Sequence, residues 1–233
     1  MPKRRPKPAA DDVPANAPSS ATPEPVGDLH VSYTLLALGT VLHRVHQSQF
    51  QADQFNPGVR GNARFSPIQD GQGQAIPTLY AGTTLPCALM ETVFHDVPHT
   101  AGFKSFDKAK LAGQVHSTLR VEADLQLVDL SSVALRKLGV TRKQLIDTEK
   151  DQYPATRKWA MALHRHCPQA QGLSWVSRQD DSARAVVLFG ERIAGDALQA
   201  GHGSHSLTDD PSTYEAVLDL ADRIGVSIIS GKS

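Results

Sequence analysis

The sequence has few features of a secreted or membrane-embedded protein. Its 233 residues include only two cysteines, Cys87 and Cys167, which lie far apart, so a disulfide framework is not expected. No run approaches about 18 consecutive apolar residues, and the N-terminal segment MPKRRPKPAADD lacks the apolar stretch of a secretory signal. We therefore expect a cytoplasmic protein that makes no contact with membranes.

The chain also lacks an excess of charge of either sign. Lysine and arginine together number 24, and so do aspartate and glutamate. Because nucleic-acid binding depends on a positive field, direct binding to nucleic acid is not expected. The sequence contains no GxGxxG, GxxxxGK[ST], GxSxG or HExxH motif. Their absence argues against Rossmann dehydrogenases, P-loop NTPases, esterases and zincins.

The composition divides the chain into two parts. Residues 1–28 are rich in proline, alanine, serine and aspartate and contain almost no large apolar side chains, so we expect a disordered tail. The rest of the chain is long enough to bury one sizeable core, since 40% of all residues are hydrophobic. We expect it to form a single domain over residues 29–233.

Short strand patterns and helical patterns follow one another along this domain. Strands are expected in TVLHRVH, IPTLYAG, GLSWVS and ARAVVLFGE, with two more in AGQVHSTLRVEADLQLVD. Helices are expected in PCALMETVFHDV, SSVALRKLGV, YPATRKWAMALHRHC and PSTYEAVLDLADRIG, where Trp159, Ala162, Leu163 and His166 would share a face of the third. The polar segment PIQDGQGQA is expected to be a flap or a surface insertion. Since the order lacks regular βαβ alternation, the expected fold class is α+β.

The stretch from Arg64 to Glu91 places an arginine, a tyrosine and a glutamate around one strand-to-helix turn. Tyr80 is expected to close the strand, and Glu91 to lie one or two turns into a helix that opens at Pro86. A single carboxylate in an apolar stretch fits a solvated position on the outer face, or a partly buried acid that faces a cleft. The second alternative would make this turn a binding site for an anion, a ring and a developing positive charge.

A metal site has little support in the sequence. Candidate ligands occur close together in HRHC at 164–167, in HGSH at 202–205 and in the Glu91/His95 pair. On a helix, however, His164 and His166 would point about 200° apart. We expect no metal site.

A serine hydrolase has little support either. Ser177 with Asp180 or Asp181 could be combined with one of the ten histidines, but no nucleophile elbow accompanies them. We do not expect Ser177 to be a covalent nucleophile.

Four segments, VLHRVH, ARFSP, TLYAGTTLPCALMETV and GLSWVSR, resemble the RES domain family in order and approximate spacing. The name of that family refers to its arginine, glutamate and serine. The likeness covers about residues 35–195 and is strongest from Tyr80 to Glu91. The resemblance implies an ADP-ribosyltransferase-like mixed β core flanked by helices, and an enzyme that consumes NAD.

The same resemblance assigns roles to five residues. It implies that Glu91, Arg64 and Ser177 are catalytic and that Arg44 and Tyr80 bind the substrate. Arginine forks suit pyrophosphate oxygens, and an ionised Glu91 could stabilise positive charge at the ribosyl carbon. Tyr80 offers a ring face and a hydroxyl, whereas Ser177 would position nicotinamide or ribose.

Two features depart from the family pattern and concern the mouth of the pocket. NARFSP stands where the family usually has a diglycine followed by tryptophan and Asn-Pro, so Ser66 replaces an asparagine. The PIQDGQGQA segment is longer than the usual link to the tyrosine strand.

The resemblance implies an NAD glycohydrolase or NAD phosphorylase, with NAD as substrate and no further cofactor. It also implies a toxin of a RES/Xre toxin-antitoxin pair, which would form an oligomer with an Xre-like antitoxin. The sequence does not decide whether water or phosphate is the acceptor. Two alternatives remain open, namely an ADP-ribosyltransferase that modifies a macromolecule and a non-catalytic module that binds NAD or another nucleotide.

Overall fold

The computed structural model describes residues 21–98 and 100–230. Its strands are β1 (Tyr33–Leu36), β2 (Val41–Gln47), β3 (Ile68–Gln69), β4 (Ala75–Ile76), β5 (Thr78–Gly82), β6 (Lys104–Asp107), β7 (Gln114–Val121), β8 (Leu125–Asp129), β9 (Gly172–Val176), β10 (Arg184–Phe189), β11 (Leu198–Ala200), β12 (His205–Ser206) and β13 (Val226–Ile229). Its α-helices are α1 (Leu85–Thr92), α2 (Ser132–Leu138), α3 (Arg142–Leu145), α4 (Tyr153–His166) and α5 (Pro211–Arg223). Short 3-10 helices are η1 (Lys108–Leu111), η2 (Lys150–Gln152) and η3 (Gly190–Arg192).

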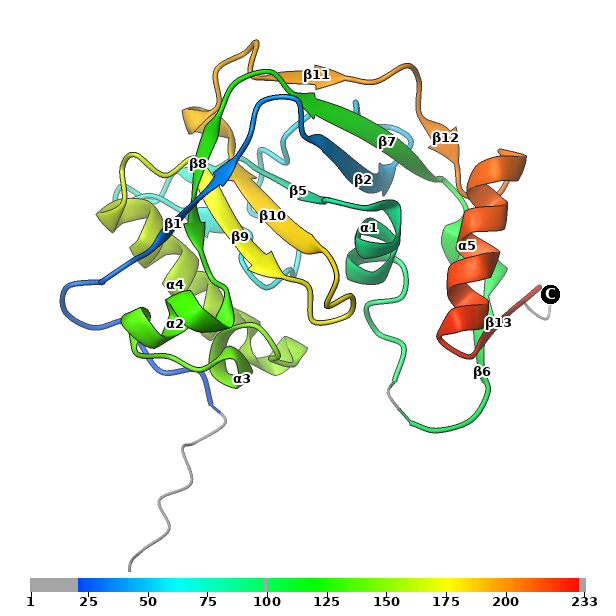
Figure 1. Ribbon diagram of the computed structural model, residues 1–233, viewed down its shortest axis with the longest axis horizontal. Coiled ribbons are helices and arrows are strands. Elements are labelled where there is room, and N and C mark those ends of the chain that lie inside the picture. Colours follow the sequence, from blue (N-terminus) through cyan, green and yellow to red (C-terminus); the bar gives the residue numbers. More distant parts are fainter. Residues whose placement is uncertain (1–20, 99, 231–233) are drawn as a thin grey trace, which may run out of the picture.

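One large sheet forms the centre of the molecule (Figure 1). Its strands follow the order β1-β8-β9-β10-β5-β2-β7-β11, and β12 also pairs with β7. β8 and β9 run parallel, whereas the other paired strands of this sheet run antiparallel. A mixed sheet with flanking helices in one domain confirms the expected α+β class.

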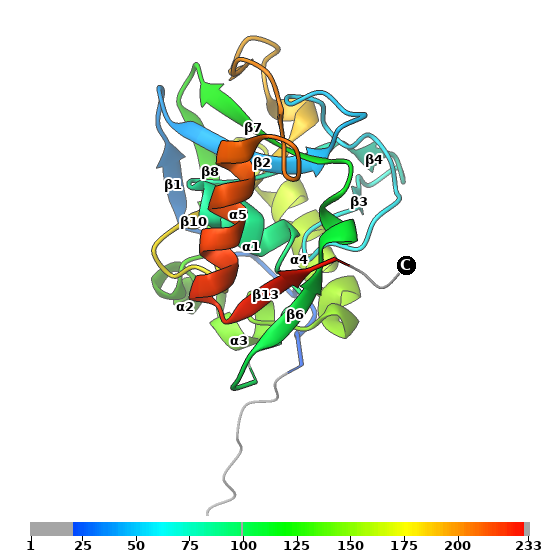
Figure 2. The same ribbon diagram turned by 90° about the vertical axis from the view of Figure 1, so that its right-hand side faces the viewer.

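The helices gather in two places around this sheet. α2, α3 and α4 lie near β8 and β9, and their apolar faces share a core with Trp175 and Phe189. α1 packs against β2, β5 and β10, and its Leu89 and Phe94 in the loop that follows share a second core with Val217 of α5. The parallel pair β6 and β13 lies beside α5 on the flank of the molecule (Figure 2).

The turn from β5 into α1 forms as the sequence predicts. Thr84 is the N-cap, since its side chain accepts a hydrogen bond from the Cys87 backbone N–H, and Pro86 lies in the first turn of the helix. Gly82 ends the strand where a Cβ atom would come within 2.9 Å of Cys87 Sγ. Tyr80, however, is the third residue of the five in β5 and does not close the strand.

The PIQDGQGQA segment was expected to be a flap or a surface insertion, and its residues 71–74 are exposed. It forms the hairpin β3–β4, in which Ile68 pairs with Ile76. Both isoleucines are buried in the same core as Trp175. The Asp70 side chain accepts hydrogen bonds from the Gln72 and Gln74 backbone N–H groups and so closes the turn. Two apolar residues at the ends of a polar turn therefore anchor it.

The buried face of α4 also differs slightly from the expected one. Trp159, Ala162 and Leu163 are buried, but His166 is exposed. Cys167, directly after the helix, is buried instead. The helix ends at His166, so the chain turns before that side chain reaches the core.

Residues 1–20 of the predicted tail lie outside the described residues, but the following residues are packed. Trp159 Nε1 donates to the Pro23 carbonyl at 2.7 Å, Thr22 Oγ1 donates to the Gln144 carbonyl at 2.6 Å, and Lys158 pairs with Glu24 at 2.6 Å. The packed chain therefore begins before the predicted boundary at residue 29. Across residues 21–98 and 100–230, no helix is both long and apolar enough to span a membrane.

Candidate active site

A cleft of about 380 Å³ lies where β2, β5 and α1 meet the start of α4. Its volume falls within the range of small-molecule sites, about 300 to 1,000 Å³. Arg44, Arg64, Tyr80 and Glu91 line it together with Tyr153 of α4. Four of the five predicted site residues therefore meet in one cleft, although they lie on separate elements of the chain.

Glu91 lies in the last turn of α1, and its side chain is 14% exposed. Ser177 Oγ donates a hydrogen bond to Glu91 Oε1 at 2.7 Å. Ser177 Oγ in turn accepts hydrogen bonds from the Gln179 and Asp180 backbone N–H groups, both at 3.1 Å. These two donors leave the Ser177 proton directed at the carboxylate. The glutamate is thus a partly buried acid that faces a cleft, and the alternative of a solvated outer position is wrong.

Ser177 itself is fully buried and does not line the cleft. In the structure its hydroxyl donates to Glu91, so the expected hydrogen bond to nicotinamide or ribose stays a prediction. Ser177 therefore acts on the cleft through the orientation of Glu91.

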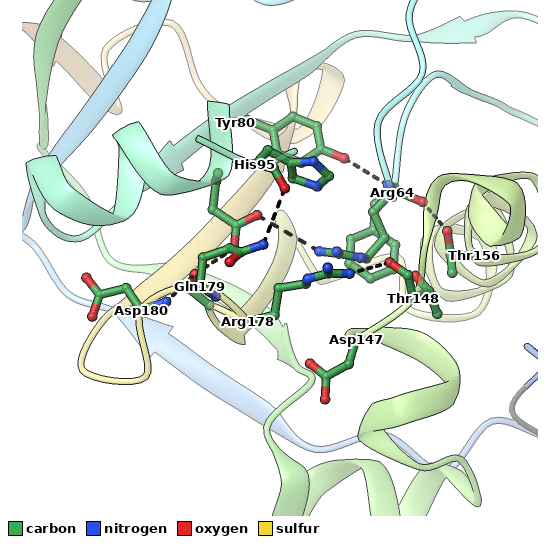
Figure 3. Close-up of polar contacts among 12 residues, drawn as sticks. Arg64, Tyr80, His95, Asp147, Thr148, Thr156, Arg178, Gln179 and Asp180 are labelled. Atoms are coloured by element: carbon green, nitrogen blue, oxygen red, sulfur yellow. Dashed lines mark hydrogen bonds and ion pairs between the residues drawn. The ribbon is translucent and has the colours of Figure 1, made fainter. Parts of the chain in front are cut away.

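The loop that carries Ser177 is fixed from outside the cleft. Arg142 donates to the carbonyls of Val176 and Ser177, both at 3.1 Å. Arg178 donates to the Thr148 carbonyl at 2.6 Å, and Gln179 Nε2 donates to the His95 carbonyl at 3.4 Å (Figure 3). These bonds limit the movement of the serine and hence of the carboxylate.

Arg64 precedes β3 and is buried, with 4% of the residue exposed. Its Nη1 lies 4.0 Å from Glu91 Oε2. Its Nε and Nη2 atoms are buried and have no hydrogen-bond partner among the described residues. An unpaired buried donor costs about 1 to 3 kcal/mol, and more on a charged group. Such an exception needs an explanation, and Arg64 also lines the cleft, where an anion would pair with its charge.

Arg44 lies in β2 and points into the same cleft, but some of its donors are used by the protein. Nη1 donates to the Ala52 carbonyl at 2.6 Å and to the Gln51 carbonyl at 3.3 Å. Burial lowers the pKa of Arg44 to about 10, and the Asp53 carboxylate counteracts part of this effect. The guanidinium therefore remains charged at neutral pH while it holds the 51–52 loop.

Tyr80 contributes its ring to the cleft, and its hydroxyl serves a structural contact. Its Oη accepts a hydrogen bond from the Phe65 backbone N–H at 2.9 Å, and its ring meets Trp175 edge-on at 6.2 Å. Burial raises the pKa of Tyr80. The hydroxyl thus anchors the segment that carries Arg64, whereas the ring lines the cleft.

Sequence reasoning missed a row of polar residues that joins the segment after α1 to η2 and the start of α4. Tyr153 Oη and His95 Nε2 lie 2.8 Å apart, His95 Nδ1 and Asp96 Oδ1 lie 2.9 Å apart, and Lys150 Nζ donates to Asp96 Oδ2 at 2.6 Å. All four line the cleft. For His95 the sequence offers its i, i+4 spacing from Glu91, which suggests metal ligation and not a hydrogen-bonded row.

The candidate metal ligands do not converge. His164 is buried and lies 2.7 Å from Glu191 Oε1, whereas His166 is exposed and contacts the Ala162 carbonyl. Within the part of the chain that the structure describes, no three histidine, cysteine, aspartate or glutamate side chains are placed to hold a metal ion.

Comparison with known proteins gives one result that covers the cleft. The profile of the RES domain matches residues 41–212, which include all five predicted site residues. No curated protein matches the chain. Because the match spans most of the sequence, the chain belongs to the RES domain family.

Proposed function

We propose that this protein consumes NAD by cleaving the N-glycosidic bond between ribose and nicotinamide. The observation that carries the proposal is the arrangement of Glu91 and Arg64. A carboxylate held by the Ser177 hydroxyl lies at the wall of the cleft, beside a buried guanidinium with two unpaired donors. This combination suits a substrate with both an anionic group and a carbon that becomes positively charged.

The chemistry assigns a task to each group. When the bond from the ribosyl carbon to nicotinamide breaks, nicotinamide leaves with the electron pair as a neutral molecule, and the ribosyl carbon becomes oxocarbenium-like. The Glu91 carboxylate stabilises this charge or holds a ribose hydroxyl. Arg64 and Arg44 bind the pyrophosphate, and the ring of Tyr80 packs against a ring of the dinucleotide. NAD is the substrate in this proposal, and no further cofactor is required.

The acceptor completes the reaction in one of two ways. Water would give ADP-ribose, nicotinamide and a proton, as in a glycohydrolase. Inorganic phosphate would give ADP-ribose with a phosphate on the freed ribosyl carbon, as in a phosphorylase. Incubation with NAD in buffers with and without phosphate, followed by chromatography and ³¹P NMR of the products, distinguishes the two.

The test of the proposal is nicotinamide release by the purified protein and by Glu91→Gln. We expect the variant to lose at least about 100-fold in rate, because the amide cannot stabilise positive charge as a carboxylate does. Glu215→Gln is the matched control, since this glutamate is exposed on α5. Full activity in Glu91→Gln would refute the role of the carboxylate, and absence of release by the unaltered protein would refute the function.

Two other outcomes would identify a different activity. Transfer of label from labelled NAD to protein or nucleic acid would establish an ADP-ribosyltransferase. Tight NAD binding in calorimetry without nicotinamide release over hours would establish a binding module.

We further propose that the protein is the toxin of a RES/Xre pair, held inactive in a complex with an Xre-like antitoxin. This part of the proposal is supported by the family alone. Expression of the protein should arrest growth, and co-expression with the product of a neighbouring Xre-like reading frame should restore it. Growth unaffected by the active enzyme would contradict a toxin role without affecting the assignment of the chemistry.

A further inference from the structure

Tyr153 occupies a position in the cleft that the proposed reaction does not explain. It is the first residue of α4 and is 1% exposed. The Arg64 guanidinium carbon lies 5.6 Å from the centre of its ring. A guanidinium over an aromatic face is attracted by the ring, and more strongly where water is excluded.

The first turn of α4 holds Arg64 at a second point. The Thr156 hydroxyl donates a hydrogen bond to the Arg64 carbonyl, so backbone and side chain of this arginine both rest on one helical turn. Figure 3 shows Thr156 and the Arg64 side chain on the α4 side of the cleft. The Glu91 carboxylate, at 4.0 Å, is too distant for a hydrogen bond and cannot fix the guanidinium by itself.

The orientation of the Tyr153 ring is fixed by a chain of hydrogen-bonded side chains that runs from Tyr153 through His95 to Asp96. Asp96 is an acceptor for His95 Nδ1, because the pKa of Asp96 is lowered, chiefly by its hydrogen bond from Lys150. His95 Nε2 is then left to accept a hydrogen bond from the Tyr153 hydroxyl, which keeps its proton because burial raises its pKa. Each hydrogen bond in this chain is thus donated toward the carboxylate, first from Tyr153 to His95 and then from His95 to Asp96.

We propose that Tyr153 and His95 are positioning residues that hold the Arg64 guanidinium for the anionic group of the substrate. This inference rests on the proposed function, because it concerns the binding of that substrate. A guanidinium with two donors unsatisfied among the described residues can turn about its long side chain, and the Tyr153 ring restricts it to the orientation in which Arg64 lines the cleft. The loss of this support weakens binding more than it slows the chemical step.

The test measures binding and catalysis separately. ADP-ribose affinity is measured by calorimetry, and kcat and KM for nicotinamide release are measured with NAD. Tyr153→Leu removes the ring and should weaken ADP-ribose binding at least about 10-fold and raise KM similarly, with kcat changed less than about 3-fold. Tyr214→Leu is the matched control, because the Tyr214 ring lies under a lysine, Lys108, at 4.4 Å and outside the cleft.

A second pair of variants separates positioning from a general effect on folding. Tyr153→Phe keeps the ring and loses its bond to His95, and His95→Gln removes the same bond from the other side. Each should weaken ADP-ribose binding by about 2- to 5-fold. The double variant should bind ADP-ribose no more weakly than the single variants, because substitutions within one hydrogen-bonded chain do not have additive effects. If Tyr153→Leu does not fold, these two variants still test the positioning role of Tyr153 and His95.

The outcomes distinguish this inference from the proposed function. If the unaltered protein releases nicotinamide and folded Tyr153→Leu, or the Tyr153→Phe and His95→Gln pair, binds ADP-ribose normally, the positioning role is refuted and the function stands. Additive losses in the double variant would also refute it. If the unaltered protein neither releases nicotinamide nor binds ADP-ribose, both conclusions are refuted.

Discussion

Arg64 and Arg192 show how differently two regions of the molecule use the guanidinium of an arginine. At the C-terminal end of α4, Arg192 donates to the carbonyls of Cys167, Ala170 and His164 at 2.9, 2.8 and 2.7 Å. In the cleft, two of the three nitrogens of Arg64 have no acceptor among the described residues. Arg192 satisfies the carbonyls that the end of a helix leaves free, so its charge contributes to the fold.

The contrast indicates which region is built for a ligand. A buried donor without a hydrogen bond is destabilising, and Arg64 keeps two such donors even though its charge lies 4.0 Å from Glu91. Such violations are expected at functional sites. We infer that Arg64 costs the free protein stability that is recovered when an anion binds, whereas Arg192 stabilises the protein with or without a ligand.

The largest expected effect is on the cleft arginine. Arg64→Met should reduce kcat/KM for nicotinamide release by at least about 1,000-fold, since it removes both the charge and the fork. The free energy of unfolding should change by no more than about 1 kcal/mol, because the removal of two unsatisfied buried donors offsets the loss of the ion pair with Glu91. Urea unfolding and steady-state kinetics measure the two quantities. A strongly destabilised Arg64→Met would contradict the proposed difference between Arg64 and Arg192.

The corresponding substitution at Arg192 should have the opposite effects on stability and activity. Arg192→Met leaves three carbonyls without their donor and should lower the free energy of unfolding by about 2 to 4 kcal/mol. The folded fraction should keep its kcat and KM, because Arg192 does not line the cleft. Lost activity in fully folded Arg192→Met would mean that the two regions are coupled.

Ser177 is an intermediate case, since its hydroxyl serves both fold and site. Ser177→Ala removes the bond to Glu91 and two backbone contacts, so we expect kcat to fall by about 10-fold and the free energy of unfolding by about 1 to 2 kcal/mol. Ser131→Ala is the control, because Ser131 caps α2 far from the cleft. It should cost about 1 kcal/mol of stability and leave kcat unchanged.

The smallest effect is expected where β2 meets β7. His43 and His116 stack at 5.2 Å with Nδ1 of the first 3.0 Å from Nε2 of the second. Burial, followed by the charge of His43, lowers the pKa of His116 to about 4. The unfolded chain therefore binds more protons than the folded protein between about pH 6.5 and 4.

The sign of the pH effect follows from that difference. The stabilisation is complete above about pH 6.5 and is lost as the pH falls toward the lowered pKa of His116. His205 and Asp210 face the same ring and act in opposite directions. Unfolding curves at pH 7 and 5 should differ less in His116→Gln than in the unaltered protein, and an equal difference in both would exclude His116 as its origin.

The turn from β5 to α1 could be predicted because its signals are local. Thr84, Pro86 and Gly82 act on neighbours within a few residues, and the alternation in VLHRVH fixes the faces of β2. The five site residues came from the resemblance to a family, and the structure brings four of them to one cleft. Their chemistry could be described from residue types alone, but their partners could not.

The remaining features depend on contacts between distant parts of the chain. The hairpin at residues 68–76 looks like an exposed loop until Ile68 and Ile76 are seen to enter the core. Residues 22–24 resemble the rest of the tail in composition, yet they contact α3 and α4 more than 120 positions away. Composition reports the average character of a segment and cannot report that a single proline carbonyl meets Trp159.

The sequence by itself determined the α+β class, the strand-to-helix turn and the identity of the arginine, glutamate and serine. Only the tertiary structure decided that the Ser177 proton is directed at Glu91, that Arg64 lies over Tyr153 with two donors unsatisfied, and that His95 belongs to the same cleft. The physical reason is that capping and periodicity act over a few residues of chain, whereas hydrogen-bond satisfaction depends on which distant groups share a space from which water is excluded.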